Sequence, residues 1–172
     1  LDVSVVSSWQ SESEVLVAER LREQGIGVRL VGPALSALKR HPEPKAHLEV
    51  LGRDQRRVLE RLGPLAEAAG FVLAGGTGLA LQLGHRRSVD FDWFTEQALG
   101  DPLRLARRLQ EHRVALRVES TQAGTLHGRV SGVRVSFLEY RYPLLERPLR
   151  LPGLSTPLAS IPDIACMKLS AI

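Results

Sequence analysis

The segment from Val89 to Trp93 alternates between apolar and acidic residues, and no other pattern restricts the fold of this chain as strongly. Successive side chains of a β-strand point to opposite faces, so strict alternation predicts a half-buried strand. We expect Val89, Phe91 and Trp93 to be buried and Asp90 and Asp92 to emerge together on the other face. Asp is disfavoured in strands, and two carboxylates this close repel each other. A divalent cation such as Mg²⁺, which takes oxygen ligands, is the predicted partner, and a solvated strand face is the alternative.

A glycine turn, Gly75–Gly78, precedes this strand and lies between an apolar run, Phe71–Ala74, and a short apolar helix. Backbone N–H groups at such a turn can approach a phosphate closely, and a helix N-terminus adds partial positive charge. We therefore expect phosphate binding by Gly75, Gly76 and Thr77. The turn is neither a P-loop, since no Lys follows it, nor a G-x-G-x-x-G fingerprint, and a plain turn is the alternative.

Helical and strand periodicities alternate along the rest of the chain. Helices are expected at 11–24, from Arg53 to Gly70 with a kink or break at Gly63-Pro64, from Pro102 to about His112, and from Pro162 onward. Strands are expected at 28–31, 114–118, 126–130 and 133–140, with Ser131-Gly132 as a hairpin turn between the last two. This order predicts an α/β (α+β) fold, a mixed β-sheet with flanking helices.

Composition and charge divide the chain into two parts. Pro42 and Pro44 mark a linker, so we expect an N-terminal extension of unknown role at 1–46 and a core at 47–172. Residues 1–50 hold 6 basic and 7 acidic groups, whereas residues 51–172 hold 17 and 12. A basic core suits a polyanionic partner, and a solvated arginine surface explains it equally well. The chain begins with Leu and stops within a predicted helix, so we expect the core to be truncated at its C-terminus.

Cysteine content and hydropathy limit the location of the protein. Cys166 is the single cysteine of the 172 residues, which excludes an internal disulfide and favours the reducing cytoplasm. The charge-free stretch 71–84 has 14 residues and is too short for a membrane span, which needs about 20 residues. We therefore expect a cytoplasmic protein without a membrane partner.

The run LAGGTGLALQLGHRRSVDFDWF, residues 73–94, combines a hydrophobic-Gly-Gly turn with an Asp-hydrophobic-Asp strand. This pattern resembles the DNA-polymerase-β-like nucleotidyltransferase superfamily. Within it the chain is similar to the AbiEii/AbiGii-type toxins, which are bacterial abortive-infection and type IV toxin–antitoxin nucleotidyltransferases. The runs GTLHGRVSGVRVSFLEYRYPLL (124–145) and IPDIACMKLSAI (161–172) support the same branch, so the resemblance covers about residues 50–172.

The resemblance implies an enzyme that transfers a nucleoside monophosphate from an NTP to an RNA, notably tRNA, or to a protein acceptor. It implies that Asp90 and Asp92 are catalytic and hold Mg²⁺, and that Lys168, in a helical Lys motif, contacts phosphates. It also implies a cognate antitoxin as a partner. Arg86 and Arg87 directly precede the aspartates, so we expect them to contact the triphosphate, with a basic surface turn as the alternative.

One position departs from the superfamily pattern. The third carboxylate expected on a later strand is replaced by Ser136, and Glu139 could substitute only if a β-bulge intervened. The alternative function is therefore a degenerate protein that binds a nucleotide or a partner without catalysis. A third hypothesis makes residues 1–46 a protein-docking module. We interpret His127, in the predicted hairpin, as a structural histidine.

Overall fold

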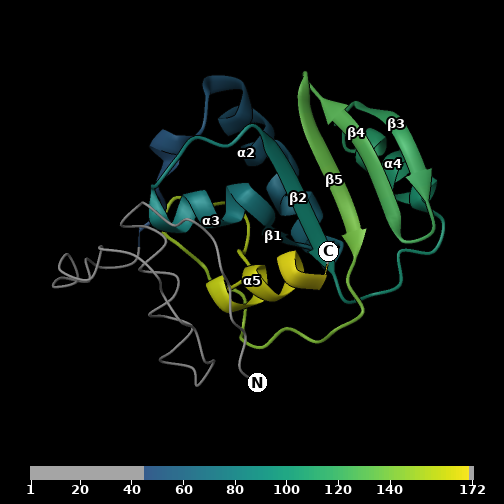
Figure 1. Cartoon of the computed structure of the whole chain (residues 1–172). Coiled ribbons are helices and arrows are strands. Elements are labelled where there is room, and N and C mark those ends of the chain that lie inside the picture. The colour runs from purple at the N-terminus through teal and green to yellow at the C-terminus, as the bar shows by residue number, and fades with distance from the viewer. Residues whose placement is uncertain (1–44, 171–172) are drawn as a thin grey trace, which may run out of the picture. The chain divides into compact units, whose positions relative to one another are not determined.

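A five-stranded sheet in the order β1-β2-β5-β4-β3 forms the centre of the structure, a computed structural model that describes residues 45–170 (Figure 1). The strands are β1 (Val72–Ala74), β2 (Asp90–Thr95), β3 (Leu116–Gln122), β4 (Thr125–Val130) and β5 (Val133–Glu139). β2 and β5 run parallel, and the other neighbouring pairs are antiparallel. The predicted mixed sheet is confirmed. The elements expected at 11–24 and 28–31 lie outside the described residues, and the division at residue 46 stays a prediction.

Helices lie on both faces of this sheet. They are the 3₁₀ turn η1 (Leu48–Val50) and the α-helices α2 (Arg53–Ala68), α3 (Gly75–Leu83), α4 (Pro102–Glu111) and α5 (Ile161–Ser170). α2 and α4 share one apolar core with the buried side chains of β2, β4 and β5. On the other face, Ile164 and Met167 of α5 pack with Phe94 of β2. Figure 1 shows α4 behind β3 and β4, with α5 in front of β1 and β2. None of the helices between residues 45 and 170 combines the length and the hydropathy that a membrane span requires.

β2 follows the predicted alternation, with one exception. Phe91 and Trp93 are fully buried, while Asp90 and Asp92 point to the other face. Trp93 stacks on Phe137 of β5 with ring centroids 6.4 Å apart, which ties the two parallel strands together. Val89 was expected to be buried with them and this was wrong, because the strand begins at Asp90 and leaves Val89 68% exposed outside the sheet.

The predicted hairpin is confirmed. β4 and β5 are joined by Ser131 and Gly132, whose φ angles of 49° and 82° are both positive, as a two-residue turn of type I′ requires. β3 was predicted at 114–118 but pairs with β4 as far as Gln122. The polar end of β3 has no apolar signal of its own, and its strand conformation comes from hydrogen bonding to β4.

Two helices differ from their predicted limits. α2 runs without a break through Pro64, although proline removes one helical hydrogen bond. α3 begins at Gly75, so the predicted tight turn is the first turn of this helix.

α4 begins as predicted: the Asp101 carboxylate accepts a hydrogen bond from the Leu103 N–H at 2.9 Å, and Pro102 follows the cap.

Candidate functional site

Asp90 and Asp92 lie on the same face of β2 and are both half-buried. The glycine turn approaches this face directly. A Cβ on residue 75 would lie against Oδ2 of Asp92, 2.9 Å from its Cβ and 3.1 Å from its Cγ. Gly75 also has a φ of +59°, a conformation that favours glycine. The strand that carries the aspartates and the turn that begins α3 therefore meet at Asp92.

Arg86 lies at the second glycine of the turn. A Cβ on Gly76 would be 2.7 Å from Nη2 of Arg86, so the guanidinium group is next to the N-terminal turn of α3. Arg86 remains exposed and can bind an anion there. Arg87 is exposed as well, but the contacts around Gly76 and Asp92 do not include it. The structure thus brings Arg86 to the glycine turn, and the role of Arg87 stays a prediction.

Thr77 has a different partner from the expected phosphate. Its side chain is 1% exposed, and its hydroxyl donates a hydrogen bond to the backbone carbonyl of Asp90. This contact attaches the first turn of α3 to the start of β2. The Thr77 hydroxyl is therefore already bonded within the protein, and phosphate binding at Thr77 stays a prediction.

Burial and the neighbouring Asp90 carboxylate raise the pKa of Asp92. The Ser136 hydroxyl opposes this rise, as do the charges of His127 and Arg134. Two nearby carboxylates on one face of the sheet offer the oxygen ligands that a hard divalent cation binds. Such a cation would relieve the repulsion between the two carboxylates. Among the described residues, no group of three or more His, Cys, Asp or Glu side chains could hold a metal ion.

The raised pKa predicts how stability depends on pH without metal. Because the folded state binds the Asp92 proton more tightly than the unfolded state, stability should fall as pH rises from about 3.8 through the raised pKa. Asp92→Asn should remove this contribution, so its advantage over wild type in urea unfolding should grow as the pH rises above about 3.8 and level off once the pH has passed the raised pKa. Asp54→Asn, which removes an exposed carboxylate of α2, is the control variant for the same unfolding measurement. A constant difference for Asp92→Asn would contradict the prediction.

The strand register decides between the two later candidates. Ser136 is the cross-strand partner of Asp92, so both side chains lie on one face. The pairing of β5 with β2 and β4 is regular from Arg134 to Leu138, with no bulge that would turn Glu139 to this face. Glu139 instead accepts a hydrogen bond from the Leu99 N–H and pairs with Arg141. It therefore does not supply a third carboxylate.

The sheet adds basic groups that sequence reasoning did not assign to the site. Arg134 is the partner of Asp90, Arg129 is the partner of Arg134, and Arg117 is the partner of Arg129. We call Arg117, Arg129 and Arg134 the arginine row; Arg129 also pairs with Glu119 at 2.7 Å. The row lies on the face opposite to α2 and α4. Alternation within each strand was visible in the sequence, but the order of the strands was not.

Lys168 lies on α5 with an exposed side chain. α5 packs beside α3, but in the described part of the chain the contacts around Asp92 do not include this lysine. The implied phosphate contact of Lys168 therefore stays a prediction.

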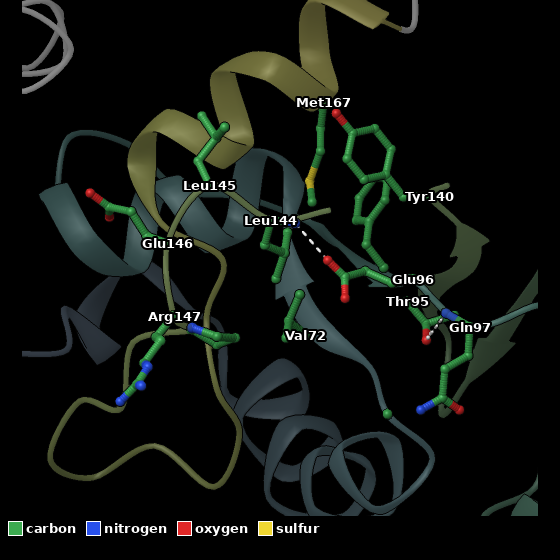
Figure 2. A pocket seen from close by; sticks show the side chains of 13 residues that line it. Val72, Thr95, Glu96, Gln97, Tyr140, Leu144, Leu145, Glu146, Arg147 and Met167 are labelled. Carbon is green, nitrogen blue, oxygen red and sulfur yellow. Dashed lines mark hydrogen bonds between the residues drawn. The ribbon is translucent and has the colours of Figure 1, made fainter. Parts of the chain in front are cut away.

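A cavity of about 460 Å³ lies at the far end of β2, beyond the aspartates (Figure 2). Its lining is largely apolar and includes Val72, Phe94, Leu144 and Met167. Figure 2 shows Met167 pointing into it from α5, and the Glu96 carboxylate accepts a hydrogen bond from the Leu144 N–H at its wall. None of the predicted site residues lines it, so it is separate from the glycine turn.

Comparisons with known proteins found the following similarities. Residues 57–144 match a family described as "Nucleotidyl transferase AbiEii toxin, Type IV TA system". An uncharacterized protein of Aquifex aeolicus (strain VF5) is 41% identical over 124 residues, which are 71% of this chain and 59% of that protein, so the chain spans less than two thirds of this relative. The solved apo structure of a tRNA-processing enzyme aligns with a TM-score of 0.44 and 20% identity over 69% of this chain and 36% of its own.

Proposed function

The chain belongs to the AbiEii nucleotidyl transferase toxin family, and on this premise we propose that it transfers a nucleoside monophosphate from an NTP to an acceptor hydroxyl. The observation that carries this proposal is the meeting of Asp92 with Gly75. Carboxylates that suit a divalent cation and backbone amides that suit a phosphate then face the same point. A metal–triphosphate complex needs both kinds of group together.

Each residue of the candidate site would have its own role in this reaction. Asp90 and Asp92 would hold Mg²⁺, which supplies neutralising charge at the triphosphate when bound. The glycine turn would bind phosphate oxygens through its N–H groups, with Arg86 beside Gly76 and Lys168 as further cationic contacts. The acceptor oxygen forms a bond to the α-phosphorus while the bond from that phosphorus to pyrophosphate breaks.

We further propose an RNA, with a tRNA end as the first candidate, as the acceptor. The attacking and leaving oxygens lie in line in this type of displacement. If pyrophosphate leaves on the side of the glycine turn, the acceptor arrives from the side of β5 and β4, where the arginine row begins beside Asp90. Three guanidinium groups favour a partner with several phosphates over a protein side chain. A cognate antitoxin and a cytoplasmic location belong to the same proposal.

Ser136 supports one alternative function. With a neutral side chain where the superfamily pattern has a carboxylate, the site could bind NTP without transferring it. The two functions differ in a single assay. The full-length protein is incubated with each α-³²P-labelled NTP and bacterial tRNA, with Mg²⁺ or with EDTA. Transfer predicts Mg²⁺-dependent label in the RNA fraction, whereas the alternative predicts bound NTP and no released pyrophosphate.

Arg86→Ala is expected to weaken NTP binding about 10- to 100-fold, because a charge-assisted hydrogen bond to a phosphate contributes about 1.5–3 kcal/mol. The measurement is the Kd of a fluorescent NTP in the presence of Mg²⁺. Arg56→Ala, which removes an exposed arginine of α2, should leave the Kd unchanged. Equal affinity of the Arg86→Ala and wild-type proteins would remove Arg86 from the triphosphate site.

A further inference from the structure

The arginine row belongs to a polar surface on one face of β3, β4 and β5, which we call the front face. α2 and α4 share the apolar core on the opposite face. Figure 1 shows α4 behind β3 and β4 and no described helix in front of them. The front-face side chains are half-buried to exposed. Besides the arginine row they form two further rows of cross-strand partners, which are Ser136, His127 and Ser120 in one row and Leu138, Thr125 and Gln122 in the next.

Positive charge is concentrated on this face. None of the front-face residues of β4 and β5 is acidic, and like charges directly opposite each other on neighbouring strands destabilise a sheet. Glu119 offsets this repulsion at Arg129, whose guanidinium also donates a hydrogen bond to the Gly132 carbonyl at 3.0 Å. Arg117 and Arg134 are exposed, and neither side chain has a hydrogen bond or an ion pair within residues 45–170. Two guanidinium groups of the row are therefore available to an anion.

Protection of a sheet edge does not explain the row. β3 is an edge strand, and charged side chains on such a strand prevent pairing with another chain. Arg129 and Arg134, however, lie on β4 and β5, which have neighbouring strands on both sides. The row therefore fits a polyanionic ligand that lies across the three strands.

The row leads away from the glycine turn. β1, which precedes the turn, and β5 lie on opposite sides of β2. Neighbouring strands are about 4.8 Å apart, so Arg117, on the third strand beyond β2, is about 14 Å from β2. A triphosphate at the glycine turn lies on the other side of β2 from Arg117. A ligand that contacts the whole row must therefore bring further phosphates of its own.

We propose that the front face of β3, β4 and β5 is the docking surface for the sugar–phosphate backbone of the RNA acceptor, whose strand crosses the sheet from β5 to β3. This proposal rests on the proposed function and adds how the RNA is recognised. Phosphate contacts orient a nucleic acid without reading its sequence. The front-face residues include no Phe, Tyr or Trp on which a base stacks, and their hydroxyl and amide groups suit the 2′-hydroxyl groups of RNA. Binding here should therefore be insensitive to RNA sequence.

The test measures tRNA binding by the full-length protein with Mg²⁺ but without NTP, so that no transfer takes place. Arg117→Gln combined with Arg134→Gln should weaken binding about 20-fold or more at about 0.1 M salt. The slope of log Kd against log salt concentration should fall by about 1.4–1.8, because each lost phosphate contact removes about 0.7–0.9. Arg104→Gln with Arg108→Gln changes two exposed arginines of α4, on the opposite face, and should leave both values unchanged.

Glu119→Gln tests the surface through a gain of affinity, which a misfolded protein does not produce. Loss of the Glu119 carboxylate frees Arg129 for a phosphate. The variant should bind tRNA about fivefold more tightly at about 0.1 M salt, with a slope that is steeper by about 0.7–0.9. Glu111→Gln, at the exposed end of α4, is the matched control and should bind as the wild type does.

Several outcomes would overturn the docking surface. Wild-type affinity and slope in the Arg117 and Arg134 double variant would do so and leave the proposed function intact, since transfer would then use another approach to the site. A preference of more than about tenfold between two tRNAs of unrelated sequence would overturn recognition of the backbone.

Competition separates RNA from an acidic protein as the partner. Unlabelled tRNA should displace labelled tRNA far better than polyglutamate at equal charge. Equal displacement by polyglutamate would overturn the proposal in favour of an acidic protein. A protein that binds tRNA through the row but transfers no label to any RNA would overturn the proposed function, and with it the acceptor role of the bound RNA.

Discussion

Asp90→Asn combined with Asp92→Asn should lower nucleotide transfer at least ~1,000-fold, because the protein loses the charges that hold the metal–triphosphate complex. The protein should remain folded. Both side chains keep their size, and the substitution removes the repulsion and the burial of charge that raise the pKa of Asp92. The measurement is incorporation of label from the NTP into RNA, together with thermal unfolding without metal.

The matched control removes two carboxylates elsewhere. Asp54→Asn with Glu60→Gln changes the net charge equally, in two exposed residues of α2. This variant should transfer at the wild-type rate. Wild-type transfer by the variant without Asp90 and Asp92 carboxylates would show that the reaction takes place elsewhere in the protein.

Gly75→Ala should cost about 2–4 kcal/mol of unfolding free energy and also abolish transfer. Two effects add at this position. The φ of +59° is strained for alanine, and the new Cβ would meet the Asp92 carboxylate. Relief of the second contact requires Asp92 or the first turn of α3 to move, which separates the two halves of the candidate site. Urea unfolding and the labelling assay measure the two effects.

Gly100→Ala separates strain from collision. Gly100 has nearly the same φ, +58°, and a Cβ there would meet nothing within 4 Å. This variant should cost about 1 kcal/mol and leave transfer unchanged. If Gly75→Ala proved no more destabilising than Gly100→Ala, the close approach of Gly75 to Asp92 would be contradicted.

Local sequence patterns were sufficient to predict much of the fold. Alternation identified β2 and the faces of Phe91 and Trp93, and the Asp101-Pro102 pair located the start of α4. They failed at positions where an element ends, since burial of Val89 depends on whether the strand includes it. They also failed for β3, whose polar half is a strand because β4 lies beside it.

Sequence patterns likewise predicted only part of the candidate site. The glycine turn and the two aspartates are close in the chain, so their proximity could be predicted from one segment, although their chemical roles stay predictions. The hydrogen bond from the Thr77 hydroxyl to the Asp90 carbonyl could not be predicted, because it depends on how α3 packs against β2, and phosphate binding at Thr77 stays a prediction. The position of His127 beside Ser136, the partner of Asp92, could not be predicted because it depends on the order of the strands, and the structural role of His127 stays a prediction.

Residue order alone settled which side chains share a face within each strand and which segment carries the glycine turn, because these depend on backbone geometry over a few residues. Tertiary structure decided that β5 inserts between β2 and β4. This order sets Ser136 and Arg134 beside the aspartates, with His127, Arg129 and Arg117 on the following strands of the same face. The pairing of β2 with β5 joins segments about 40 residues apart, and its register is selected by packing of the shared core, which no local pattern encodes.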